Sequence, residues 1–136
     1  LAALRRRLLS TVANPELRVV GPNLLDLLST IDQLGTIEPE AGIARARKVT
    51  EEVITPLHTK HLGPSNKPLF EQIEALHTNK HIPKNVYSYL NTVRTVGNLS
   101  VHYQPKDLVR MTASDLKLIG FITAVIIEWY ITSADA

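Results

Sequence analysis

Residues 84–104, KNVYSYLNTVRTVGNLSVHYQ, contain the pattern that decides the fold. An α-helix advances about 100° per residue, so five polar side chains of this stretch fall within about 80° of one another. We call these five side chains the polar seam: Tyr87, Asn91, Arg94, Asn98 and His102. Because most of the remaining circumference is apolar, the stretch predicts a largely buried helix with one narrow polar face.

Gly97 lies on the most apolar side of this predicted helix. A glycine in a helix interior costs about 1 kcal/mol relative to alanine, so another interaction must compensate for it. The natural compensation is a second helix that packs too closely to leave room for a side chain. We therefore expect a helix–helix contact at Gly97.

The segment that precedes this helix carries helical periodicity of its own. A helix is expected from about residue 39, with Arg47 and Glu51 one turn apart on its outside, a spacing that stabilises helices. Pro56 should kink or end this helix, because proline lacks the amide hydrogen. The predicted core stripe consists of Ile43, Ala46, Val49, Val53 and Leu57.

The rest of the chain predicts further helices, over residues 1–13, 23–34, 68–77 and about 114–133. Either Thr112 or Ser114 can serve as the N-cap of the last one. Short connections favour antiparallel neighbours. The predicted fold class is therefore all-α, an antiparallel bundle of five or six helices.

The composition agrees with one domain of packed helices. The 136 residues are enough for a single domain, and a hydrophobic content of 44% indicates a globular protein. Aromatic residues, at 5%, are fewer than a β-sandwich or barrel favours. Because the chain opens at Leu1 rather than at methionine, we expect residues 1–136 to be one helical domain of a larger protein.

Charge, cysteine content and apolar runs limit the classes of function. The chain has no cysteine, which excludes a disulfide framework, a thiolate zinc site and a cysteine nucleophile. The net charge of +2 is lower than that of a nucleic-acid binder that works by electrostatics alone. The arginines at residues 5–7 interrupt the opening apolar run, and the apolar stretch 118–131 is shorter than a membrane span. We expect a cytoplasmic protein with no membrane partner.

Two histidine pairs have spacings that occur in metal sites. His58 and His61 form an HxxH pair, and His77 and His81 form an HxxxH pair. A lysine lies inside each pair and no carboxylate is adjacent, so we interpret these residues as solvated loop histidines. We expect neither a metal ion nor another cofactor.

The polar seam permits two interpretations. Arginine, asparagine and histidine at one-turn spacing can bind an anion, and the imidazole can titrate near neutral pH. The same seam can instead be hydrogen-bonded between helices or lie along a dimer interface. The chemistry alone favours the second interpretation, because polar networks between helices are common and catalytic ones are rare.

The stretch IPKNVYSYLNTVRTVGNLSVHYQPKDL, residues 82–108, resembles the signature of a bacterial helical domain of unknown function in the HEPN superfamily. That signature has an arginine, then Gly-Asn, two or three small residues and a histidine, late in a long helix. Arg94, Gly97, Asn98 and His102 match it. The earlier stretch ARARKVTEEVI is similar to the family's preceding helix. The resemblance covers residues 40–132 as a HEPN-like core, and residues 1–39 have no match.

The resemblance implies a possible ribonuclease chemistry that this sequence fits only in part. In nuclease members the motif is an arginine, four to six residues and a histidine, and two copies meet across a dimer. The histidine acts on the ribose 2′-hydroxyl and the arginine steadies the phosphate. His102 matches the histidine, but Gly97 occupies the arginine position of the four-residue spacing and Arg94 lies one turn earlier. The resemblance thus implies the fold and dimerisation more strongly than catalysis.

These observations lead to one expected function and one alternative. We expect a non-catalytic HEPN-like interaction and dimerisation domain of a larger bacterial defence or signalling protein. Its expected partners are a second copy, the other domains of the parent protein and RNA or a nucleotide, which the polar seam would contact. The alternative is a metal-independent endoribonuclease, with His102, Arg94 and Asn98 as its catalytic residues.

Overall fold

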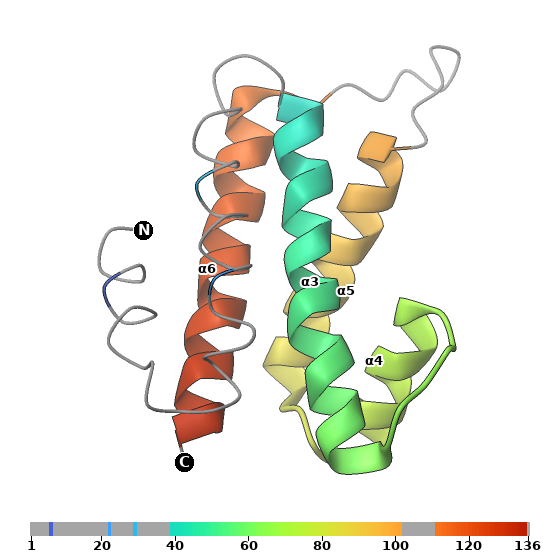
Figure 1. Cartoon of the computed structure of the whole chain (residues 1–136). Coiled ribbons are helices and arrows are strands. Elements are labelled where there is room, and N and C mark those ends of the chain that lie inside the picture. Colours follow the sequence, from blue (N-terminus) through green and yellow to red (C-terminus); the bar gives the residue numbers. More distant parts are fainter. Residues whose placement is uncertain (1–5, 7–21, 23–28, 30–38, 102–110, 136) are drawn as a thin grey trace.

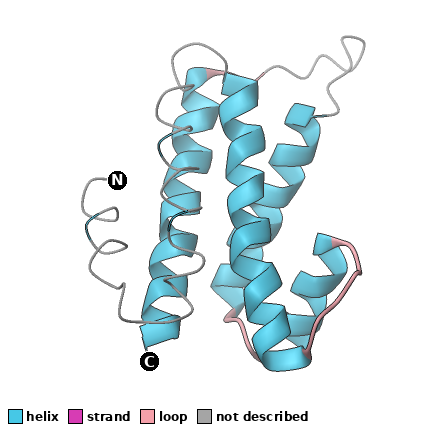
Figure 2. Ribbon diagram, viewed as in Figure 1, coloured by secondary structure: helices cyan, strands magenta, loops and turns pink. Residues whose placement is uncertain are grey.

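The computed structural model describes residues 6, 22, 29, 39–101 and 111–135, and this part of the chain is helical without strands. Its helices are α3 (Pro39–Leu62), α4 (Leu69–Thr78), α5 (Lys84–Val101) and α6 (Ala113–Asp135). Figures 1 and 2 show α3, α5 and α6 as long neighbours, with α5 running opposite to the other two. The short α4 packs at one end of the bundle. The helices expected over residues 1–13 and 23–34 lie outside the described residues, apart from isolated positions.

Helix α3, like α5, contacts every other helix of the described bundle. Its buried side follows the predicted stripe: Ile43, Ala46, Val49 and Val53 are fully buried and Leu57 is 2% exposed. The periodicity of this segment is therefore confirmed as the core face. The partner helices complete the core with Ile73, Leu76, Val86, Leu90, Val93, Ile126, Ile127, Tyr130 and Ile131, among others.

Of the two effects predicted for Pro56, a kink or an end of the helix, the end is wrong, because α3 continues to Leu62 with Pro56 inside it. Proline removes one backbone hydrogen bond and crowds the preceding turn, at a cost of about 3 kcal/mol. Ile54 and Leu57 are buried on either side of Pro56, so their packing holds the helix together through it. The helix ends instead at Gly63, whose φ of 88° is the left-handed conformation that glycine adopts freely.

Helix α6 begins at a reciprocal cap. The backbone N–H of Asp115 donates to Thr112 Oγ1 at 3.2 Å, and the backbone N–H of Thr112 donates to Asp115 Oδ2 at 2.7 Å. Two amide groups that the first turn leaves without helical partners are thereby satisfied. Of the two predicted caps, Thr112 is confirmed and Ser114 lies inside the helix.

Helix α6 is apolar on more than one side. Its inner face packs against α3 and α5, while Leu118 and Phe121 are 60% and 71% exposed. Residues Ala113–Ser133 are long and apolar enough to cross a membrane by length and composition. A core helix of a soluble protein meets the same criterion, so this property does not distinguish the two.

The cap yields a prediction about stability. Thr112→Ala should lower the free energy of unfolding by about 1 kcal/mol, because the amide of Asp115 loses its acceptor. Urea unfolding followed by circular dichroism measures this change. Thr55→Ala, which removes an exposed threonine hydroxyl in mid-helix, is the matched control and should not destabilise the protein. Equal midpoints for Thr112→Ala and the parent chain would contradict the role of the cap.

Candidate functional site

The polar seam lies on the side of α5 that borders α3 and α4. Its members Tyr87, Asn91, Arg94 and Asn98 are all half-buried. The fifth member, His102, lies outside the described residues. The seam divides into an end against α3, formed by Asn98, and an end against α4, formed by Tyr87 and Arg94.

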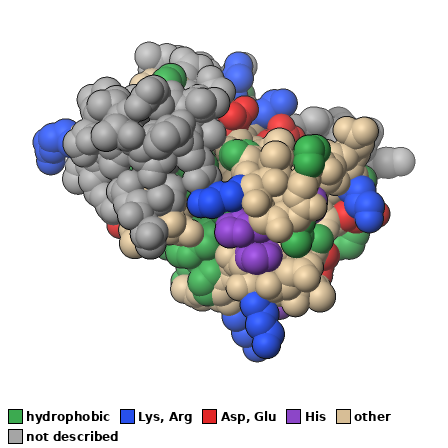
Figure 3. Space-filling model, turned by 60° about the horizontal axis from the view of Figure 1, so that its bottom comes forward, with side chains coloured by type: hydrophobic (Ala, Val, Ile, Leu, Met, Phe, Trp, Pro, Cys, Tyr) green, Lys and Arg blue, Asp and Glu red, His purple; other side chains and the backbone are tan. Residues whose placement is uncertain are grey.

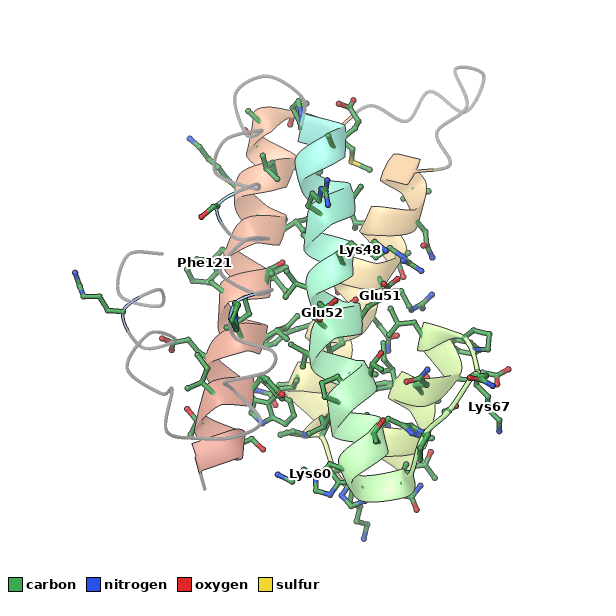
Figure 4. The ribbon with its side chains drawn as sticks, in the orientation of Figure 1. Lys48, Glu51, Glu52, Lys60, Lys67 and Phe121 are labelled. Atoms are coloured by element: carbon green, nitrogen blue, oxygen red, sulfur yellow. The ribbon has the colours of Figure 1, made fainter. Side chains whose placement is uncertain are left out.

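The end against α3 is organised by an arginine. Arg47 Nε donates to Asn98 Oδ1 at 2.7 Å, and Arg47 Nη1 donates to Glu51 Oε1 at 2.6 Å. Lys48 Nζ reaches the other oxygen of Glu51 at 3.4 Å (Figure 4). The one-turn pairing of Arg47 with Glu51 is confirmed. Two partners fix the guanidinium, so Arg47 is held beside the seam rather than free in solvent.

Gly97 makes room for this arginine. A Cβ atom added at Gly97 would lie 2.5 Å from Arg47 Cβ and 3.1 Å from its Cγ and Cδ. The expected helix–helix contact at Gly97 is therefore confirmed. The neighbour is the aliphatic stem of an arginine rather than an apolar residue, and its charged head extends past the glycine to Asn98.

The end against α4 contains a tyrosine between two side chains of that helix. The Tyr87 hydroxyl donates to a carboxylate oxygen of Glu74, and the His77 ring stacks on the Tyr87 ring with centroids 3.9 Å apart. The hydrogen bond to Glu74 raises the pKa of Tyr87 above its ordinary value of 10.0, and burial and the charge of Glu74 add to this effect. Asn91 and Arg94 act in the opposite direction. Tyr87 is thus held in its neutral, donating form.

Arg94 is directed toward α4. Its guanidinium lies 5.4 Å from the centre of the Phe70 ring, and its Nε donates to Asn91 Oδ1 at 3.4 Å. A cation over an aromatic face is attracted by about 0.5–1 kcal/mol at exposed positions. Within the described bundle, the Arg94 guanidinium is therefore held over the Phe70 ring.

The histidines are held by neighbours instead of standing free in loops. His58 is 8% exposed in α3, with its Nδ1 2.7 Å from the Gly63 carbonyl oxygen. His61 and His81 stack with ring centroids 4.2 Å apart. The interpretation as solvated loop residues is wrong for His58, because α3 extends past Pro56 and carries it into the packed region. The loop placement is also wrong for His61 and His77, which lie in the last turns of α3 and α4. In the described ranges, no group of three or more His, Asp or Glu residues is placed to hold a metal ion.

Sequence reasoning missed Arg47, Glu74 and Phe70 as partners of the seam. The spacing on one helix shows which residues share a face and says nothing about the helix opposite. For Arg47 a signal existed, since its ion pair with Glu51 and the buried glycine were both visible in the sequence. For Glu74 and Phe70 no signal distinguished them from solvated residues of α4.

The comparisons with known proteins give one family. Residues 26–136 match the family model described as "Domain of unknown function (DUF4145)". Neither the curated proteins nor the solved structures contain a match to the chain. The matched range includes the four helices of the described residues and every member of the polar seam.

The Gly97 contact yields a second prediction. Gly97→Ala should lower the free energy of unfolding, because its new methyl group would overlap the Arg47 stem, and Gly97→Leu should lower it further, by about 1–3 kcal/mol. Gly120→Ala is the matched control, since a Cβ there meets nothing within 4 Å and alanine gains up to about 1 kcal/mol. Thermal unfolding measures all three. A Gly97→Ala protein as stable as Gly120→Ala would mean that α3 and α5 are not in close contact.

The Tyr87 hydrogen bond yields a third prediction, on pH dependence. A folded-state pKa raised above the unfolded value means that the stabilisation is complete below pH 10 and is lost as the pH rises through the folded pKa. The absorbance titration of the four tyrosines should contain a late component that is absent from Tyr87→Phe. Glu74→Gln should move this component to lower pH. A titration identical in the parent chain and in Glu74→Gln would contradict the assignment.

Proposed function

We propose that this chain, which belongs to the DUF4145 family, is a non-catalytic, HEPN-like interaction domain that forms a homodimer in a larger bacterial defence or signalling protein. The observation that carries this proposal is that side chains of the polar seam contact neighbouring helices inside the bundle. Asn98 is bonded to α3, Tyr87 is bonded to α4, and Arg94 lies over a ring of α4. These contacts support a seam that ties helices together.

The outer face of α6 supports self-association. Phe121 and Leu118 are the two most exposed large hydrophobic side chains of the described residues, and they stand three positions apart on one face. Figure 4 shows Phe121 on the side of α6 that is turned away from α3. Aromatic residues in this setting are frequent anchors of protein interfaces. A second copy would cover them.

Light scattering tests the dimer as a fourth prediction. The parent chain should give twice the monomer mass at micromolar concentration, and Phe121→Asp should shift it to the monomer with its helix content unchanged. Phe70→Asp, at a half-exposed phenylalanine of α4, is the matched control and should leave the dimer intact. A monomeric parent chain at micromolar concentration would contradict the proposal.

The second candidate function is a metal-independent endoribonuclease, and one observation favours it. Arg47 places a fixed cation against Asn98, which precedes His102 by four residues. A cation there could steady a phosphate although Arg94 is directed toward Phe70. In this candidate His102 is the acid–base group, with Arg94 and Asn98 beside it.

One variant separates the two functions, as a fifth prediction. If the seam is structural, His102→Ala should lower the free energy of unfolding by about 1–3 kcal/mol and leave cleavage of mixed RNA, measured with a chelator present, at background. We expect this result. Loss of a clear parental RNA cleavage, with an unchanged melting temperature, would establish the nuclease instead.

A further inference from the structure

A hollow of about 430 Å³ opens between the end of α4, the connection from α4 to α5 and the end of α6. It is at the opposite end of α5 from Asn98 and shares only His77 with the surroundings of the polar seam. Its lining is divided by chemistry. One part is apolar, with Ile82, Pro83 and Trp129, and the other is basic, with His77, Lys80 and His81.

The described lining holds basic side chains and no carboxylate. Figure 3 views the molecule from this end and shows histidine side chains gathered on the surface with a basic side chain next to them. On α4, the carboxylate of Glu74 already accepts the hydrogen bond of Tyr87. The hollow therefore has an excess of groups that attract an anion.

The two imidazoles are fixed in position by stacking. His81 stacks on His61 of α3, with an angle of 17° between the rings, and His77 stacks on Tyr87 of α5 at 15°. The ring of His81, which follows α4, is thus supported by α3, and the ring of His77, which belongs to α4, is supported by α5. Groups fixed before binding lose less conformational entropy when a ligand arrives.

Lys80 lies at the hollow in a backbone conformation that lysine rarely adopts. Its φ is 64°, and it forms the turn that ends α4, in which the N–H of Lys80 donates to the carbonyl of His77 and the N–H of His81 donates to that of Leu76. This pattern of two bonds is the Schellman motif, and glycine is its usual residue at the Lys80 position. A residue kept in a strained conformation at a concave site points to a role for its side chain.

We propose that this hollow binds a small organic anion with a flat apolar body. The body packs against Trp129 and Pro83, and the anionic group contacts Lys80 and His81. The volume is within the range of small-molecule sites, and an apolar wall with a few converging polar groups is their usual construction. An aromatic carboxylate and an aromatic phosphate monoester share this chemistry.

Trp129 is the only tryptophan of the chain, so it reports on the hollow alone. The probes are benzoate, phenyl phosphate, inorganic phosphate and benzyl alcohol, added to the full ¹⁵N-labelled chain while the indole N–H resonance is followed. Benzoate or phenyl phosphate should give a saturable shift, with an affinity at least about tenfold higher than that of inorganic phosphate or benzyl alcohol. Whichever of the two aromatic anions binds more tightly identifies the anionic group.

The decisive variant is Lys80→Gly. Glycine adopts a positive φ without strain, so the melting temperature should stay the same or rise, while the affinity should fall about tenfold through loss of the ammonium group. Lys80→Asn, which also tolerates this conformation, should lose the same affinity. Lys117→Ala removes an equal charge from α6 about 18 Å along the helix from Trp129, and it should bind as the parent chain does.

Three results would overturn the proposal. The first is an unchanged affinity in Lys80→Gly. The second is a shift by inorganic phosphate as strong as that by phenyl phosphate, which would indicate an adventitious ion only. The third is the absence of saturation with every probe.

Discussion

The contact between Gly97 and Arg47 is the constraint on which the described bundle depends. At this point α5 has no side chain, and the stem of an arginine from α3 crosses the vacant position. The same arginine is bonded to Asn98 of α5 and to Glu51 of its own helix. A close approach of α3 to α5 and a charge-assisted hydrogen bond between the two helices therefore occur at the same place. Because α3 also contacts α4 and α6, its position against α5 determines where these two helices pack.

The sequence was sufficient for features that depend on one helix. The core stripe from Ile43 to Leu57, a cap at Thr112 or Ser114 and the need for close packing at Gly97 follow from periodicity, from side-chain chemistry and from the cost of glycine in a helix. The end of α3 could not be obtained in this way. Local propensity favours a break at Pro56, while the burial of Ile54 and Leu57 in the assembled core outweighs it.

For the candidate site too, the sequence predicted which residues share one helix face but not which residues of other helices they contact. Four members of the polar seam could be placed on one face of α5, and all four are half-buried there. Their partners could not be identified, since Glu74 and Phe70 belong to a helix whose rotation against α5 depends on the whole core. For the histidines, spacing along the chain suggested pairs within His58–His61 and His77–His81, whereas the structure stacks His61 on His81 across two elements.

The crossing of Arg47 over Gly97 has a mechanical consequence. Gly97 is the only glycine of α5, so a slide of α3 along α5 by one turn, about 5.4 Å, would bring a side chain such as that of Val93 under the arginine stem. The two helices are thereby interlocked against sliding and must move as one rigid body. A similar close approach joins α3 to α6, since a Cβ added at Gly42 would lie 2.8 Å from Leu116 Cδ1. Any rearrangement of the described bundle should thus displace α4 against the three helices that Gly97 and Gly42 hold in close contact.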